Sequence, residues 1–179
     1  MLKVRVPDAD FFNNHLQEFK VVKGQVLQLE HSLISLSRWE SKWKKPFLDG
    51  KEKTREESVD YVRCMSLTKG VDPLLYQSIP QALMNKIFEY VDAQRTATTF
   101  KKTSSKGSRE VVTSELIYFW MIYHGIPIEC EKWHLSRLLA LIRICDDKQG
   151  PQKKMSKNDI FNQNRALNAA RRRQLRTSG

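Results

Sequence analysis

The sequence is poor in the residues on which secreted, membrane and zinc-binding proteins depend. Its three cysteines are an odd number, lie far apart, and form neither a CxxC motif nor a zinc-ligand spacing: Cys64, Cys130 and Cys145. The longest apolar run, residues 116–128, is shorter than the roughly 20 residues that a membrane-spanning helix needs. The first residues lack the apolar stretch of a secretory signal. We therefore expect reduced thiols, no membrane-spanning helix, and a protein that stays in the cytoplasm where it is made.

Common catalytic and cofactor motifs are also missing. The sequence contains no P-loop, GxGxxG, GxSxG, HExxH or EF-hand pattern, and its seven glycines leave few loops for cradling a phosphate. Glu131 and His134 are spaced to share a helical face, as in carboxylate–histidine metal sites, but one such pair offers too few ligands. His15 and His31 have no partner that the sequence pattern reveals. The sequence thus predicts no catalytic residue, metal ligand or cofactor, and a protein that is not an enzyme.

Positive charge is what the sequence has in excess, and it is unevenly spread. The chain has 31 Lys and Arg residues against 20 Asp and Glu, which gives a formal net charge of +11. Residues 151–179 hold eight of the basic residues and one acid. Gly150 and Pro151 interrupt the apolar pattern just before this segment. We therefore expect two parts, a mildly basic globular body over residues 1–150 and a strongly basic C-terminal arm over residues 151–179.

The first 30 residues have the pattern of a small β element. Residues 2–6 alternate between apolar and basic side chains, which is the period of a half-buried strand. Residues 19–22 and 25–29 flank Lys23 and Gly24, a two-residue connection typical of a hairpin. We expect these segments to form an antiparallel sheet, with 19–22 paired to 25–29.

From Ser32 onward the apolar residues recur at helical spacing. Leu33, Leu36, Trp39 and Trp43 share one face of a helix that Pro46 should end. Two interpretations of the tryptophans remain open. They pack in the core or, if they are exposed, they form a binding hot spot for a partner protein.

The middle of the chain predicts two further helices and one strand. Thr54 is a suitable N-cap for a helix over residues 55–67, and residues 83–91 have the pattern of another amphipathic helix. Residues 70–80, between them, are expected to be a turn-rich connection. Residues 96–100 are rich in β-branched side chains and are expected to form a strand, followed by an exposed loop over residues 101–110.

Two consecutive helices are expected to form the centre of the body. Residues 115–124 are apolar on nearly every side, which predicts a helix packed all round and ended by Gly125. Residues 129–145 carry a wide apolar stripe that includes Trp133, and should form the second helix. The fold class is therefore mainly α (α+β): a compact helical body with a small N-terminal antiparallel β element and a basic C-terminal helical arm.

The arm is expected to form a helix over residues 157–175. Its apolar residues are too few to stabilise an isolated helix, so it should need the body or a partner to dock on. Its basic side chains suit a protein partner, nucleic-acid phosphates or a solvated tail. The candidate partner contacts in the arm are one aromatic residue and the basic residues, namely Lys153, Lys154, Lys157, Phe161, Arg165, Arg171, Arg172, Arg173 and Arg176.

Several strings along the chain resemble one protein family. They are LQLEHSLISLSRWESKWKKPFL, TATTF and ELIYFWMIYHGIPIECEKWHLSRLLALIRIC, followed by PQKKMSKNDI and LNAARRRQLRTSG. These strings are similar to those of tail assembly chaperones encoded in tailed-phage and prophage structural cassettes. The resemblance implies a non-enzymatic assembly factor in the bacterial host cytoplasm, with the phage tape measure protein and tail-tube protein as partners.

Two other functions remain open from the sequence. The first is a virion structural component, such as a connector, baseplate or head-completion protein, whose arm docks on neighbouring subunits. The second is a basic accessory protein that binds nucleic acid without sequence preference. Self-association into a homo-oligomer is compatible with each of them.

Overall fold

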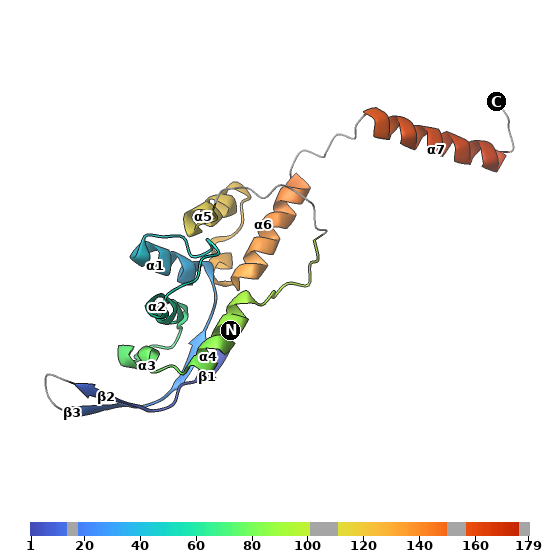
Figure 1. Cartoon of the computed structure of the whole chain (residues 1–179). Coiled ribbons are helices and arrows are strands. Elements are labelled where there is room, and N and C mark those ends of the chain that lie inside the picture. The colour runs from blue at the N-terminus through green and yellow to red at the C-terminus, as the bar shows by residue number, and fades with distance from the viewer. Residues whose placement is uncertain (14–17, 101–110, 150–156, 176–179) are drawn as a thin grey trace. The chain divides into compact units, whose positions relative to one another are not determined.

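The computed structural model of the chain describes residues 1–13, 18–100, 111–149 and 157–175. The chain divides into two units, Met1–Ile144 and Cys145–Gly179. The first unit contains the strands and most of the helices, and the second contains the arm helix (Figure 1).

Two antiparallel strand pairs open the first unit. Strand β1 (Leu2–Arg5) pairs with β4 (Val26–Leu29), and β2 (Ala9–Asn13) pairs with β3 (Glu18–Val22). In the first pair, Val4 lies opposite Leu27, and both side chains are buried. The alternating pattern of residues 2–6 therefore correctly predicted a half-buried strand.

The predicted hairpin between residues 19–22 and 25–29 is wrong, because these segments pair with different strands. Gly24 lies in the crossing between the two strand pairs. Its backbone N–H donates to Asp8 Oδ1 at 2.6 Å, and a Cβ at Gly24 would lie 2.3 Å from the Val6 carbonyl oxygen. Glycine is thus needed here for close backbone approach and not for a hairpin turn.

Helices α1 (Leu33–Trp43) and α2 (Arg55–Met65) begin at predictable capping residues. Ser32 and Thr54 are their N-caps, and both form reciprocal capping boxes with the side chain three residues on. Helix α1 ends at Lys44, whose φ of 55° lies in the left-handed region. The prediction of both helices is confirmed, and α1 packs beside α2 (Figure 1).

Two further helices follow. Helix α3 (Pro73–Gln77) lies within the segment predicted to be only turns; Asp72 caps it by accepting from the Leu74 N–H at 3.0 Å. Helix α4 (Gln81–Asp92) confirms the amphipathic helix predicted for residues 83–91.

The predicted strand at residues 96–100 is absent from the structure. Here backbone N–H groups bond to hydroxyl side chains and not to a neighbouring strand. Arg95 N–H donates to Ser136 Oγ at 2.9 Å, and Thr98 N–H donates to Thr96 Oγ1 at 3.1 Å. The loop predicted for residues 101–110 lies outside the described residues.

The last part of the first unit contains α5 (Ser114–Tyr123), a 3₁₀ helix η1 (Ile128–Lys132) and the start of α6 (Leu135–Gln149). Gly125, at φ +64°, ends the first of these as predicted. The single helix predicted for residues 129–145 is instead split into η1 and α6. The backbone is extended at Trp133, and His134 forms a β-bridge with Ser32.

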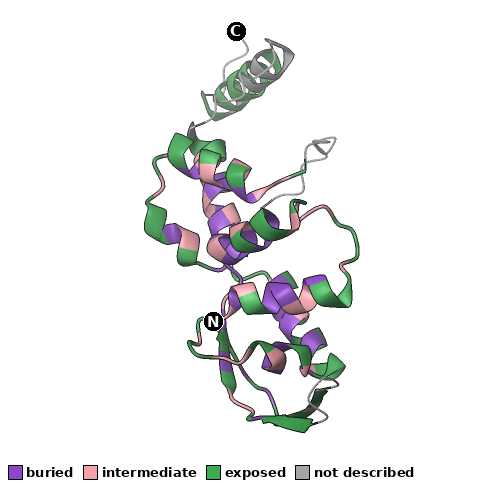
Figure 2. Cartoon of the chain, turned by 90° about the vertical axis from the view of Figure 1, so that its left-hand side faces the viewer, coloured by how far each residue is buried: buried purple, intermediate pink, exposed green. Residues whose placement is uncertain are grey.

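Two hydrophobic clusters form the interior of the first unit, and α1 contributes to both. Trp39 and Tyr61 belong to the cluster built with the strands and α2–α4. Leu33 and Leu36 belong to the cluster built with α5 and α6. Figure 2 shows the buried residues of these helices as purple segments. α1 is thus the element that the two clusters share.

The second unit contains α7 (Lys157–Leu175), with the bounds that the sequence predicted. Every residue of α7 whose burial is described is exposed. The chain as a whole is mainly α (α+β), with a small N-terminal antiparallel β element, as the sequence predicted.

Candidate functional site

Glu131 and His134, the most metal-like pair in the sequence, have separate structural roles. Tyr118 donates its hydroxyl hydrogen to Glu131 Oε2 at 2.8 Å, and His134 Nε2 lies 3.2 Å from the Tyr90 carbonyl oxygen. Among the described residues, no group of three or more potential metal ligands is found. Across the same ranges, no helix is both long and apolar enough to cross a membrane.

His31, for which the sequence pattern reveals no partner, has two in the structure. Its Nδ1 lies 2.5 Å from the Tyr61 hydroxyl oxygen, and its ring centroid lies 5.2 Å from that of His134. Burial and, to a lesser extent, the neighbouring His134 lower the pKa of His31 from 6.5 to about 3. Burial also lowers the pKa of His134. Both imidazoles are therefore neutral at pH 7 and serve as packed polar residues.

The cysteines have the environment of inert thiols. All three are free: Cys130 is buried, and Cys64 and Cys145 are half-buried. Burial raises the pKa of Cys64 to about 11, so its thiol stays protonated at neutral pH. A nucleophilic role for Cys64 is therefore disfavoured.

The two tryptophans proposed as partner contacts have different environments. Trp39 is completely buried, and its indole N–H donates to the Glu57 carbonyl oxygen at 2.9 Å. It is therefore a core residue and offers no surface to a partner. Trp43 is half-buried, and its indole N–H donates to Asp60 Oδ2 at 3.0 Å. Its ring stacks on that of Trp39, with 6.0 Å between centroids.

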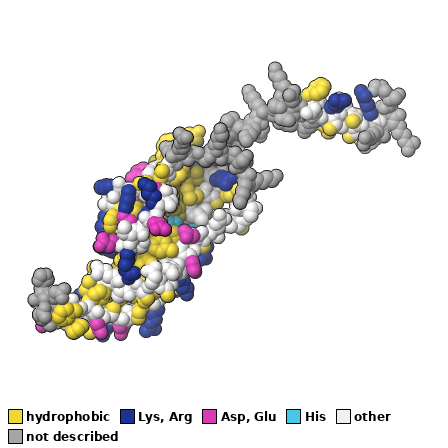
Figure 3. Space-filling view, viewed as in Figure 1, with side chains coloured by type: hydrophobic (Ala, Val, Ile, Leu, Met, Phe, Trp, Pro, Cys, Tyr) yellow, Lys and Arg dark blue, Asp and Glu magenta, His cyan; other side chains and the backbone are white. Residues whose placement is uncertain are grey.

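Helix α5 is not packed all round as the sequence predicted. Ile117 and Met121 are buried in the second cluster. Phe119, Ile122 and Tyr123, however, are 59%, 78% and 72% exposed. We call these three residues the α5 apolar face. Figure 3 shows hydrophobic side chains at the surface where α5 lies.

The sequence could not show which side of α5 is covered. When nearly every position is apolar, helical periodicity no longer marks the buried side. The structure supplies that side, because α5 packs on α1 and leaves the side chains of the α5 apolar face largely exposed. The rings of Phe119 and Tyr123 stack with 6.2 Å between their centroids, so the face has ordered aromatic content.

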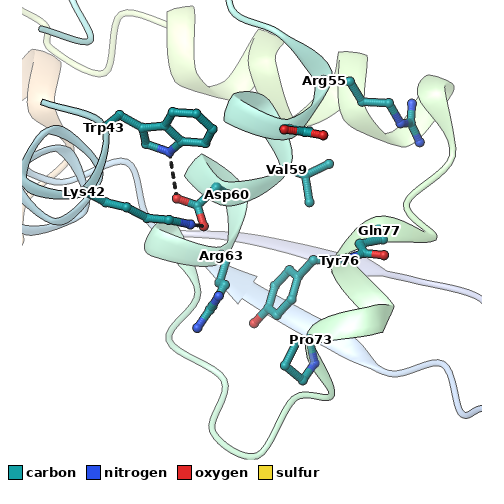
Figure 4. A pocket seen from close by; sticks show the side chains of 10 residues that line it. Lys42, Trp43, Arg55, Val59, Asp60, Arg63, Pro73, Tyr76 and Gln77 are labelled. Atoms are coloured by element: carbon teal, nitrogen blue, oxygen red, sulfur yellow. Dashed lines mark hydrogen bonds and ion pairs between the residues drawn. The ribbon is translucent and has the colours of Figure 1, made fainter. Parts of the chain in front are cut away.

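A pocket of about 540 Å³ lies between the end of α1, one side of α2, and α3. We call it the α2 pocket. Figure 4 shows the side chains that line it, among them Trp43, Val59, Asp60, Arg63, Pro73 and Tyr76. Both oxygens of Asp60 are engaged, one by Lys42 Nζ at 2.5 Å and the other by the Trp43 indole. The sequence marks only Trp43 of this pocket as a candidate contact, because the lining residues come from three separate elements.

The arm presents its candidate residues on a solvent-exposed helix. Phe161, Arg165 and Arg172 line one hollow along α7, and Arg171 is exposed as well. Lys157 and Arg173 belong to α7, but their side chains are not described. Lys153, Lys154 and Arg176 lie outside the described residues.

Comparisons of the chain with protein-family models, with curated proteins and with solved structures found no match in any of the three.

Proposed function

We propose that this protein is a non-enzymatic phage tail assembly chaperone that binds the tape measure protein and tail-tube subunits in the cytoplasm of the bacterial host. The observation that carries the proposal is the α5 apolar face. Three large apolar side chains stand exposed on a helix whose other side is anchored in a core. A surface of this kind is typical of a protein-binding site.

The spacing of the α5 apolar face favours a helical partner. Phe119, Ile122 and Tyr123 follow the i, i+3, i+4 pattern by which one helix packs on another. Each such side chain contributes roughly 1.5–3 kcal/mol when it is fully removed from water. The resemblance implies a long, helical tape measure protein as partner, and an amphipathic helix of that protein is the occupant we propose.

A second candidate function draws on the arm. Phe161, Leu167 and Leu175 of α7 are 67%, 50% and 70% exposed, so the arm has apolar side chains to bury on another subunit. This observation favours a virion structural component whose arm docks on its neighbours. The same helix has exposed arginines that can contact nucleic-acid phosphates, so binding of nucleic acid is a further alternative.

Coexpression with the tape measure protein of the same phage tests the first proposal. We expect the wild-type protein to keep the tape measure protein soluble and to copurify with it. The double variant Phe119→Gln, Ile122→Gln should lose at least tenfold of the recovered complex. Phe19→Gln, Val21→Gln is the matched control, because those side chains are 72% and 63% exposed on β3. The proposal is contradicted if the α5 double variant yields as much complex as the wild type, or if the wild type yields no complex.

Mass spectrometry of purified virions separates the two candidates. A chaperone acts and departs, so it should occur in the infected-cell lysate and be absent from particles. A fixed copy number per particle would favour the structural component.

A further inference from the structure

The α2 pocket contains two hydrogen-bond donors that the fold leaves unused. Tyr76 is only 4% exposed, yet its hydroxyl bonds to none of the residues that the structure describes, and it lines the pocket. The Arg63 guanidinium, on α2, likewise has no hydrogen bond or ion pair within the described part of the chain. Ser66 Oγ is the one enclosed side-chain polar atom without a partner among the described residues, so the Tyr76 hydroxyl opens to the solvent of the pocket and is available to a ligand there.

The other charged residues that line the pocket are Lys42, Arg55, Glu56 and Asp60. Lys42 is paired with Asp60 at 2.5 Å, so these two charges offset each other. Arg55 donates to the Ile79 carbonyl oxygen and to Gln81 Oε1. Glu56 also lines the pocket, exposed on the same face of α2 two helical turns before Arg63, so the three basic and two acidic lining residues leave a net charge of +1. The charge left free beside Tyr76 is therefore that of Arg63, and it favours an anion.

Apolar walls flank these donors. The half-buried side chains of Trp43 and Val59 and the ring of Pro73 line the same hollow, with the Tyr76 ring between α2 and α3 (Figure 4). An apolar pocket with a few convergent polar groups is typical of a ligand site. Such a pocket suits an anionic group that has an apolar neighbour.

We propose that the α2 pocket binds an acidic peptide segment of a partner protein. Arg63 and Tyr76 donate to a Glu or Asp side chain of that segment, and an adjacent apolar side chain packs on Trp43 and Pro73. The net charge of +11 attracts acidic partners to the protein in general. This site goes beyond the proposed function, since it lies in α1–α3 and uses none of the α5 apolar face.

Titration of the full-length ¹⁵N-labelled protein with two peptides tests the proposal. The probe is acetyl-Glu-Leu-Phe-Glu-amide, and the control peptide has Gln in place of both Glu residues. The indole N–H signal of Trp43 reports binding directly at the pocket. We expect the acidic peptide to bind at least tenfold more tightly than the Gln peptide, because charge-assisted hydrogen bonds are the stronger kind.

Three variants assign the effect to the proposed donors. Arg63→Met keeps the length of the apolar stem and should weaken binding of the acidic peptide about tenfold. Tyr76→Phe removes only the hydroxyl and should weaken it about fivefold. Lys86→Met removes one positive charge from an exposed position on α4, outside the pocket, and should leave the affinity unchanged.

Several outcomes would overturn the proposal. The first is equal affinity for the two peptides, and the second is wild-type affinity in both pocket variants. The third is a set of NMR signal changes that includes residues elsewhere but not the Trp43 indole. Inorganic phosphate is titrated as well, and displacement of the peptide at comparable concentration would make the pocket a general anion site. Phe119→Gln, Ile122→Gln should bind the peptide normally, so failure here and failure of tape measure binding can be distinguished.

Discussion

Glu40 holds the first residue of α5 against α1. Its Oε2 accepts the Ser114 backbone N–H at 2.7 Å, although the two residues are 74 positions apart, and its Oε1 accepts the Phe47 N–H at 2.8 Å. The side chain is only 6% exposed. One buried carboxylate thereby satisfies two backbone donors and fixes the orientation of the helix that carries the α5 apolar face.

Loss of one acceptor at Glu40 should destabilise the protein. Glu40→Gln replaces one carboxylate oxygen with an amide nitrogen, which leaves one of the two backbone N–H groups unpaired, at a cost of about 1–3 kcal/mol. Urea denaturation measures the free energy of unfolding. The control is Glu89→Gln, at an exposed position on α4, which should change it by less than about 0.5 kcal/mol. Equal stability of Glu40→Gln and the wild type would contradict this role for Glu40.

The His31–His134 pair should make the protein sensitive to acid. Burial lowers the pKa of both imidazoles in the folded state, to about 3 for His31, whereas the unfolded chain titrates near 6.5. Between these values the unfolded chain binds more protons, so the free energy of unfolding falls as the pH falls. Each histidine contributes a slope of up to about 1.4 kcal/mol per pH unit.

Urea denaturation between pH 7 and pH 5 measures this slope above the range in which most carboxylates titrate. His31→Gln should reduce the slope by the contribution of one group. A wild-type stability that does not change over this range would rule out the proton linkage.

The two tryptophans should differ in their contribution to stability. Trp39→Ala empties a fully buried site and should cost about 3–5 kcal/mol. Trp43→Ala removes a half-buried ring and should cost roughly half as much. The difference can be read from denaturation midpoints at equal m-values. The reverse order would mean that Trp43, and not Trp39, anchors the packing of α1 against α2.

Deletion of residues 156–179 should leave the thermal transition of the remaining chain nearly unchanged. The residues of α7 whose burial is described are all exposed, so little apolar burial is lost with them. Differential scanning calorimetry of the truncated chain checks this expectation. A drop of several degrees would show that the arm contributes to the core.

Partner binding by the truncated chain identifies what the arm binds. Loss of protein binding would support a docking helix. If the full chain instead binds duplex DNA, the affinity should fall with salt at a log–log slope of about 0.9 per phosphate contacted. Binding that does not respond to salt would exclude that use of the arm.

Local chemistry explains which parts of the fold could be predicted from the sequence. The start of α2 was predicted from its capping residue Thr54, and the start of α1 from the helical spacing that begins after Ser32, which the structure shows to be its N-cap. Strand pairing depends on contacts between distant residues, and the β3–β4 hairpin was wrong because β3 pairs with β2. Nothing near Lys23 and Gly24 marks the backbone contact with Val6 that separates the two strand pairs.

The candidate sites follow the same division. The bounds of α7 were predicted from local pattern, whereas the α5 apolar face and the α2 pocket depend on which elements pack together. No sequence pattern near His31 indicates its partners, because Tyr61 and His134 lie far from it in the sequence and belong to other parts of the fold. Burial of Trp39 likewise follows from the position of α2, to which its indole N–H is bonded.

The shared position of α1 has a consequence for how the first unit unfolds. Trp39 is part of one cluster, and Leu33 and Leu36 are part of the other. If either cluster loses its packing, α1 loses the contacts on that side, and this weakens the other cluster as well. The two clusters therefore melt together as one cooperative unit, and the slowest-exchanging amide hydrogens should be those of α1.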